Sequence, residues 1–336
     1  MRPTALDVAR AAGVSVATVS NALNDTGRAS AATRTRVREV AASMGYRPNA
    51  AGRTLRTGRT GVLALAVTTF GEQTWNFAEV AYYAQMVAAA TSAAHAHGYA
   101  LTVLPASLDV DGWHAVSADG VVLLDSPEGD PAAEVLRARG IPIAFDGQPH
   151  QLGPRDSWVD NDHAATMAKV LGHLREQGAR RIALLAQNTS DHYTRDCVAA
   201  YRAQVRTPRI ALLDSTDPVG RAEAERLLRE GADAVYGLLD DSGRGVLAAA
   251  DALGLRVPDD VLVVTASEDP TYASTSPPIS TVSLRPADTI TAAVDALAAT
   301  LAGAPPTVRA DLATDLVVRA SSTRRPSAGR GGRLRS

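Results

Sequence analysis

The sequence contains a single cysteine and no long apolar run. With only Cys197 among 336 residues, an intrachain disulfide framework is excluded and a reducing compartment is expected. The longest apolar stretch, around Gly61–Val67, is far shorter than the roughly 20 residues that a membrane-spanning helix needs. No basic segment followed by an apolar one opens the chain, as it would in a secretory signal peptide. We therefore expect a cytoplasmic protein with no membrane partner, long enough for two or three domains.

The net charge of −2 hides an uneven distribution of charge along the chain. Residues 1–60 hold ten arginines against three acidic residues, and residues 321–336 hold five arginines and no acidic residue, so the middle is acidic. A basic N-terminal segment followed by an acidic domain is typical of a nucleic-acid-binding arm joined to a domain with a different function. Basic segments that are merely solvated are the alternative. The tail, 322–336, is rich in Arg, Gly and Ser and is expected to be disordered.

Helix caps divide the first 45 residues into three short helices. Thr4, Ser15 and Ser30 are suitable N-caps, whereas Gly13 and Gly45 are suited to the left-handed conformation that ends a helix. An apolar spacing of three and four residues supports the third helix. The predicted helices are Ala5–Ala12, Val16–Leu23 and a third one between Ser30 and Gly45.

From Gly61 onward, short apolar runs alternate with alanine-rich helical stretches. Such alternation over about 250 residues indicates parallel sheets that are covered by helices on both faces. The predicted strands are 62–67, 100–104, 120–124, 142–145, 181–185, 234–239 and 261–265. The predicted helices include 78–97, 164–177, 222–230 and 245–253, while the stretch between Leu104 and Gly120 is too short for a further helix of ordinary length.

The first two predicted helices have the spacing of a helix-turn-helix. Ala9 is small enough for a close helix crossing, Gly13 supplies the tight turn at positive φ, and Val19 fills the angle between the helices. The start of the second helix then points away from the domain, where it could enter a major groove. The residues that would face base edges are Val16, Ala17 and Asn21. Another small three-helix domain with the same packing is the alternative.

A dense pattern of residues covers positions 4–56: Asp7-Val8-Ala9, Ala12-Gly13-Val14-Ser15, Thr18-Val19-Ser20, Leu23-Asn24, Thr33-Arg34, Gly45-Tyr46, Pro48-Asn49 and Leu55. This pattern strongly resembles the LacI/GalR family of bacterial repressors, and a weaker similarity continues to about Ser321. The resemblance implies that Val16, Ala17 and Asn21 read bases. It places near phosphates the residues Ser15, Thr18, Ser20 and Asn24.

The chemistry of the three base-reading positions indicates a preference for A·T pairs. Val16 and Ala17 offer only apolar contact, which suits thymine methyl groups, and Asn21 can form a bidentate pair with adenine. We therefore expect A·T pairs in part of each half-site.

Residues 48–60 form a predicted hinge. Pro48 cannot continue the third helix, and Asn49 can cap a short one over 50–55, which is too short to be stable alone in water. The resemblance implies that this helix folds against a dimer mate in the minor groove, where Leu55 is wedged between central base pairs. Gly52 stands where relatives usually have Ala, and Gly destabilises a helix by about 1 kcal/mol relative to Ala. Arg53 and Arg56 are further predicted DNA contacts. The alternative is that this segment is a plain linker, in which the two arginines would be solvated charges.

The resemblance also implies the fold of the rest of the chain, a periplasmic-binding-protein-like core of two α/β subdomains joined by three crossovers. The crossovers are expected near Trp158–Asp160, Val282–Leu284 and Thr307–Leu312. The predicted domains are the helix-turn-helix domain at 1–47, the hinge and linker at 48–60 and the core at 61–321, divided into an N-subdomain (61–159 and 283–306) and a C-subdomain (160–282 and 307–321).

The core carries candidate contacts for a small-molecule effector. Asp146, Arg195 and Asp240 lie past the ends of predicted strands, where open α/β sheets bind ligands, and they match the family's ligand contacts. The pair Tyr82-Tyr83 matches positions that line the cleft from the other subdomain. Each acidic residue taken alone could be a helix cap. Two departures from the family pattern leave the effector open: Ser215 at a position that often holds a stacking aromatic residue, and Leu239 in place of an Asn.

Two rival readings are an enzyme and a plain sugar-binding protein. Gly243-Arg244-Gly245 is a weak dinucleotide motif, and His95 and His97 face different sides of a helix and cannot bind one metal together. We therefore expect no catalysis, no cofactor and no metal. The predicted protein is a homodimeric regulator, by default a repressor, which binds a palindromic DNA operator and responds to a sugar or similar polar effector. The alternatives are a regulator that has lost its effector response and a cytoplasmic small-molecule-binding protein.

Overall fold

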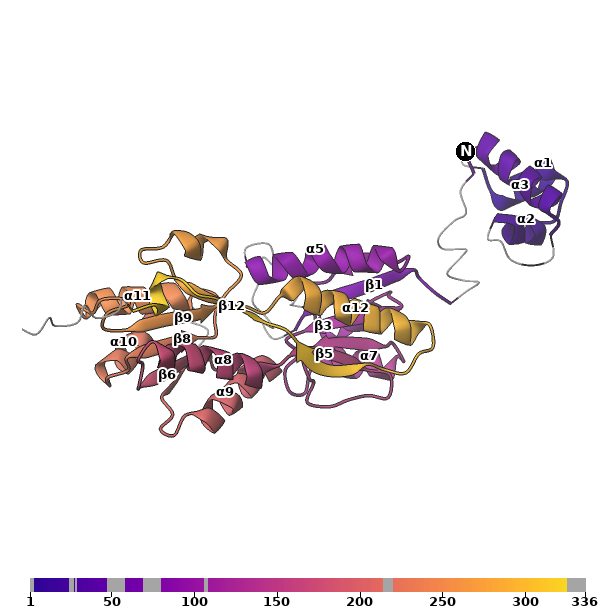
Figure 1. Ribbon diagram of the computed structural model, residues 1–336. Helices are drawn as coiled ribbons and strands as arrows, with labels where there is room; N and C mark the ends of the chain where they lie inside the picture. Colours follow the sequence, from indigo (N-terminus) through magenta and orange to yellow (C-terminus); the bar gives the residue numbers. More distant parts are fainter. Residues whose placement is uncertain are drawn as a thin grey trace, which may run out of the picture. The chain divides into compact units, whose positions relative to one another are not determined.

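The computed structural model describes residues 3–23, 27, 29–46, 58–68, 80–105, 108–213 and 220–324. The chain divides into two compact units, Met1–Gly61 and Val62–Ser336 (Figure 1). Several predicted DNA contacts lie outside the described residues, namely Asn24, Asn49, Gly52, Arg53, Leu55 and Arg56, and so does Ser215.

The N-terminal unit contains three helices that pack around a small apolar core. They are α1 (Ala5–Ala12), α2 (Val16–Leu23) and α3 (Ala31–Ser43), so the predicted bounds of the first two are confirmed. Thr4 caps α1 through a reciprocal capping box, in which Asp7 N donates to Thr4 Oγ1 (3.3 Å) and Thr4 N donates to Asp7 Oδ2 (2.9 Å). The core residues are Val8, Ala9, Ala12, Val19, Ala22, Val37 and Ala41.

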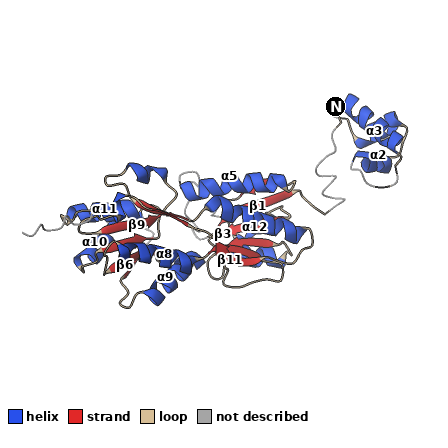
Figure 2. Cartoon of the chain, viewed as in Figure 1, coloured by secondary structure: helices blue, strands red, loops and turns tan. Residues whose placement is uncertain are grey.

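The second unit contains two six-stranded sheets (Figure 2). All strand pairs in the first sheet are parallel, in the order β11-β5-β4-β3-β1-β2. Its strands are β1 (Val62–Val67), β2 (Ala100–Val103), β3 (Gly120–Leu124), β4 (Ile143–Asp146), β5 (Ser157–Asn161) and β11 (Val308–Leu312). Two helices share an apolar core on one face, α5 (Ala81–Ala96) and α12 (Pro286–Leu301), and two others cover the second face, α6 (Val110–Ala115) and α7 (Pro131–Ala138).

The second sheet has the order β12-β10-β9-β8-β6-β7, with β12 antiparallel to its neighbour. Its strands are β6 (Ile182–Gln187), β7 (Ile210–Leu213), β8 (Ala234–Gly237), β9 (Leu262–Ala266), β10 (Ser280–Ser283) and β12 (Asp315–Val317). One face packs on α8 (His163–Glu176) and α9 (His192–Gln204), and the other on α10 (Arg221–Arg229) and α11 (Ser242–Ala252). Short 3₁₀ helices follow β9, at Pro270–Ser274, and β12, at Ala320–Ser322. The predicted parallel sheets with helices on both faces are confirmed.

The chain passes between the two sheets three times. It leaves the first sheet after β5, returns after β10 and leaves again between β11 and β12. Because β11 pairs with β5, Val308–Leu312 belongs to the first sheet, so the predicted assignment of 307–321 to the C-subdomain is wrong for this strand. The stretch between Leu104 and Gly120, expected to be too short for a helix of ordinary length, contains the six-residue helix α6, which Asp109 caps by accepting from Gly112 N. None of the described helices is both long and apolar enough to cross a membrane.

Candidate functional site

The geometry of the first two helices is that of a helix-turn-helix. Ala9 and Val19 are almost fully buried between the helices, and Gly13 has a φ of 63° at the turn. An added Cβ at Gly13 would meet nothing within 4 Å, so the requirement for glycine is conformational rather than steric. The backbone therefore reverses direction tightly enough to hold α2 across α1.

The start of α2 presents apolar side chains to solvent. Val16 and Ala17 are exposed, Val16 at 42% of its surface, while Asn21, one turn later, is half-buried. Ser15 caps the helix, since Thr18 N donates to its Oγ (3.1 Å). Thr18 and Ser20 are half-buried beside these residues. The structure thus places the six described residues of the predicted reading surface on one short helix and its cap, and their individual contacts with DNA stay predictions.

A cavity of about 330 Å³ lies at the carboxyl ends of the strands of both sheets. Residues from the first sheet and α5 line one side, and residues from the second sheet and its helices line the other. The predicted contacts Tyr82, Tyr83, Asp146 and Asp240 all line this cavity. Open α/β sheets bind ligands at this edge, and the volume is in the range of small-molecule sites.

Two tyrosines of α5 are paired with carboxylates of the first sheet. The Tyr82 hydroxyl donates to Asp146 Oδ2 (3.2 Å), and the Tyr83 hydroxyl donates to Asp125 Oδ2 (2.5 Å). The two rings meet edge to face, with centroids 5.2 Å apart. This arrangement orients both carboxylates and leaves the tyrosine rings as an apolar surface in a wall that is otherwise polar.

Burial strongly perturbs the carboxyl groups of this wall. Burial raises the pKa of Asp146 well above its ordinary value, and the charges of Asp125 and Asp160 add to that effect. Burial and then the charge of Asp191 raise the pKa of Asp125 to about 7, against the opposing effect of the hydrogen bond from Tyr83. Carboxyl groups in this state can both donate and accept hydrogen bonds near neutral pH.

The opposite wall is formed by the loops after β8 and β9. Asp240 accepts a hydrogen bond from the Ser267 hydroxyl, and burial raises its pKa. Glu268 accepts from Ser283 Oγ (2.9 Å) and from Leu284 N (2.8 Å), at the point where the chain crosses back to the first sheet. A ligand in contact with Glu268 would therefore touch one of the crossovers directly.

Arg195 does not line the cavity, in contrast to the sequence prediction. Its guanidinium is paired with Asp196 instead, with Nε 2.7 Å from Oδ1, and its side chain is 37% exposed. The neighbouring positions of α9 that line the cavity are Tyr193 and Thr194, with His192 at the start of the helix. Since successive helical residues are turned by about 100°, a two-residue difference in register decides which side chain faces the cavity.

Several lining residues were missed at the sequence level. Asp125 and Asp160 follow or end apolar strands in the same way as Asp146, so the same strand-end signal would have found them. Asp191 lies before α9 and caps it, because Thr194 N donates to its Oδ1 (2.9 Å). His163 and His192 open two different helices, and nothing in their spacing indicates that they meet.

Comparisons with known proteins agree on both units. Residues 4–49 match the family described as "Bacterial regulatory proteins, lacI family", and residues 171–322 match a "Periplasmic binding protein-like domain". The HTH-type transcriptional regulator CelR of Thermobifida fusca is 31% identical over 301 residues, covering 84% of this chain and 86% of the relative. DegA of Bacillus subtilis (strain 168), also an HTH-type transcriptional regulator, is 26% identical with the same coverage.

Solved structures show the same fold. A complex of the transcriptional regulator CelR with cellobiose has a TM-score of 0.69 at 27% identity, covering 95% of this chain and 100% of the other. The lac repressor dimer bound to operator and to the anti-inducer ONPF has a TM-score of 0.77 at 24% identity, covering 96% and 100%. Together with the helix-turn-helix and the two-sheet core, this likeness shows that the chain belongs to the LacI family of bacterial helix-turn-helix transcriptional regulators.

Proposed function

We propose that this regulator binds an inverted-repeat operator as a homodimer in the cytoplasm, and that a small polar effector in the cavity changes its affinity for DNA. The observation that carries the proposal is the cavity itself, which joins both sheets and touches a crossover through Glu268. An effector that prefers one arrangement of the two sheets shifts the population toward it. Repression released or imposed by the effector is the expected consequence.

The DNA side of the proposal rests on the exposed start of α2 and on the basic N-terminal residues. Val16, Ala17 and Asn21 would read bases, and two-fold symmetry of a dimer would give a palindromic site. For the hinge residues, which lie outside the described part of the chain, the proposal rests on the family resemblance. A leucine wedge by Leu55 would open the central base step.

The lining of the cavity favours a neutral polyhydroxylated effector such as a sugar. Seven acidic side chains line it, and no lysine or arginine is among the described lining residues. Carboxylates accept hydrogen bonds from sugar hydroxyl groups, and the rings of Tyr82, Tyr83 and Tyr193 offer apolar surface. We expect the acidic side chains to disfavour phosphorylated sugars and other anions, although His163 and His192 also line the cavity. The relative solved with cellobiose supports the same class of effector.

A regulatory role rather than catalysis is also proposed. The relatives are transcriptional regulators, and the cavity carboxylates Asp146, Asp125 and Asp240 are each held by a hydrogen bond from a neighbouring hydroxyl group. That arrangement suits fixed recognition of hydroxyl groups.

The test is a thermal-shift screen of the full-length chain against neutral mono- and disaccharides and their phosphates. We expect at least one neutral sugar to raise the unfolding midpoint, because a ligand that binds only the folded state stabilises it, and we expect the phosphates to have no effect. Asp146→Asn should reduce the shift, and Asp251→Asn, an exposed matched control on α11, should retain it. A screen in which only sugar phosphates stabilise the protein would contradict the proposed effector class.

A further inference from the structure

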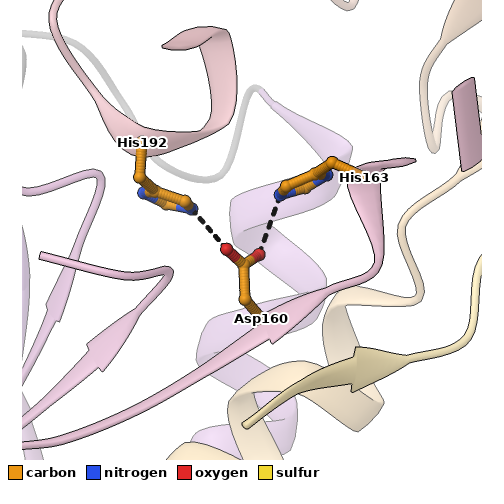
Figure 3. A group of neighbouring side chains, drawn as sticks. All are labelled: Asp160, His163 and His192. Atoms are coloured by element: carbon orange, nitrogen blue, oxygen red, sulfur yellow. Dashed lines mark ion pairs between the residues drawn. The ribbon is translucent and has the colours of Figure 1, made fainter. Parts of the chain in front are cut away.

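Three side chains with metal-binding atoms meet in one wall of the cavity. Asp160 comes from the end of β5, and His163 and His192 are the first residues of α8 and α9 (Figure 3). The Nε2 atom of His163 lies 2.8 Å from Asp160 Oδ1, and that of His192 lies 3.7 Å from Asp160 Oδ2. All three ligand atoms lie within 4.8 Å of one another. The two imidazoles approach the carboxylate from opposite sides.

The His163 ring lies close to Asp160 but in poor hydrogen-bonding geometry. Its side chain is only 6% exposed, and neither of its ring nitrogens has a partner in hydrogen-bonding geometry, although Nε2 lies close to the carboxylate. Buried polar atoms are nearly always hydrogen-bonded, and the exceptions often mark the place of an ion or a water. The poor alignment of both ring nitrogens is therefore one observation that points to a further ligand at this cluster.

His192 is held in position from the other side of the cavity. Its ring lies against Gly147, the residue after β4, where a φ of 92° and the absence of a side chain leave room for it. An added Cβ at Gly147 would lie 1.7 Å from His192 Nε2. The cluster thus joins Asp160, at the end of a strand of the first sheet, to the N-termini of two helices that cover the second sheet.

The charge of the surroundings favours a cation. The three residues share the cavity with Asp125, Asp146 and Asp191, and no lysine or arginine is among the described lining residues. The N-termini of α8 and α9 carry partial positive charge of about half a unit each and oppose a cation. A bound cation would in turn favour the ionised form of the neighbouring carboxyl groups.

We propose that Asp160, His163 and His192 bind a divalent transition-metal ion, with Zn²⁺ as the best fit. Two imidazoles and one carboxylate are a donor set that Zn²⁺ binds with one position left open, whereas Ca²⁺ and Mg²⁺ prefer oxygen ligands alone. Zn–N and Zn–O distances of about 2.0–2.2 Å require ligand atoms about 3.3 Å apart in a tetrahedral site. The separations of 2.8 and 3.7 Å, each to a different oxygen of Asp160, lie on either side of that value.

The open position of the ion would face the cavity, because all three ligands line it. An oxygen atom of a bound effector can occupy this position. Since the ligands come from both sides of the cavity, the ion would also link the two subdomains. The proposal concerns metal binding and does not depend on whether the protein binds DNA.

The experiment is calorimetric titration of the chelator-treated, full-length chain with Zn²⁺, with Mg²⁺ titrated in parallel. We expect one Zn²⁺ per chain, no comparable binding of Mg²⁺, and an affinity at least about tenfold lower in His163→Ala and His192→Gln, since even indirect ligand partners are worth that much. His95→Ala, an exposed histidine outside the cluster, should match the wild type. Circular dichroism checks that each variant is folded.

A second measurement covers the case in which a buried variant does not fold. Co²⁺ in the wild-type protein should give the visible absorption bands of a low-coordinate site, and these should be absent from His192→Gln. No saturable binding of Zn²⁺ to the wild type, or equal binding by the wild type and His192→Gln, would overturn the proposal. In that case the three residues are a buried ion-pair network without a metal.

Discussion

Asp125 is the cavity residue whose charge gives the clearest test of the cavity electrostatics. It follows β3 with a φ of 51°, a conformation that few residues besides glycine, asparagine and aspartate adopt readily. Its carboxyl group has a pKa of about 7, raised by burial and by the charge of Asp191. Replacement by Asn keeps both the backbone preference and the acceptor for Tyr83, so Asp125→Asn isolates the effect of the charge.

The sign of the pH dependence follows from the raised pKa. Between the ordinary pKa of 3.8 and about 7, the folded state holds a proton that the unfolded state has released, so stability falls as the pH rises through this window. Above pH 7 the ionised group destabilises the fold by at most a few kcal/mol, at roughly 1.4 kcal/mol per pKa unit. This is an upper bound, since Asp125 is only half-buried.

We therefore expect Asp125→Asn to be more stable than the wild type at pH 8 and nearly equal to it at pH 4.5. Urea denaturation at both pH values measures the two differences. Asp251→Asn, on the exposed side of α11, provides the control and should show little difference at either pH. A stability difference between Asp125→Asn and wild type that does not change with pH would mean that Asp125 has an ordinary pKa.

At the scale of single elements, α1 and α2 offer a matched pair of helix caps. Thr4 Oγ1 accepts from Asp7 N, and Ser15 Oγ accepts from Thr18 N. Loss of either cap should destabilise the N-terminal unit by about 1 kcal/mol. Only Ser15 lies at the start of the proposed reading helix, so Ser15→Ala should weaken operator binding several-fold more than Thr4→Ala.

Hydrogen exchange of α1 and α2 measures the stability loss, and fluorescence anisotropy on operator DNA measures the binding loss. Equal binding losses for the two variants would place Ser15 away from the phosphates.

Elements with strong local signals could be predicted from the sequence, and others could not. The bounds of α1 and α2 agree because caps and Gly13 determine them locally, and the predicted strands agree within two residues at each end. In contrast, β7 was missed because it is a four-residue edge strand with only two buried residues, and α6 because it is less than two turns long. Short elements depend on tertiary packing more than on their own sequence pattern.

For the cavity too, residues with a local sequence signal could be predicted, and residues that only the fold brings together could not. Asp146 and Asp240 could be found because each follows an apolar strand. Arg195 was wrongly placed in the cavity because neighbouring positions of a helix face different directions, and the sequence does not indicate which position faces inward. His163 and His192 lie on separate helices, and only the fold brings them to Asp160.

At the scale of the whole molecule, the two units differ in charge and in fold, as expected for DNA binding by one and effector binding by the other. The arginine-rich N-terminal residues suit a polyanion, and the acidic lining of the cavity suits the neutral polar effector proposed above. A coupling free energy of a few kcal/mol between the two sites is enough to change operator occupancy substantially. The three crossovers between the sheets, one of them held by Glu268, are the route by which we expect the cavity to influence the DNA-binding unit.

The most direct measurement of the central claim is selection of genomic DNA fragments by the purified full-length chain, followed by footprinting of the best site. We predict an inverted repeat with A·T pairs opposite Val16, Ala17 and Asn21 and a C–G step at its centre, protected as one continuous site by a dimer. Binding without any repeat, lost uniformly at moderate salt, would show that only phosphate contacts are made and would contradict sequence-specific regulation.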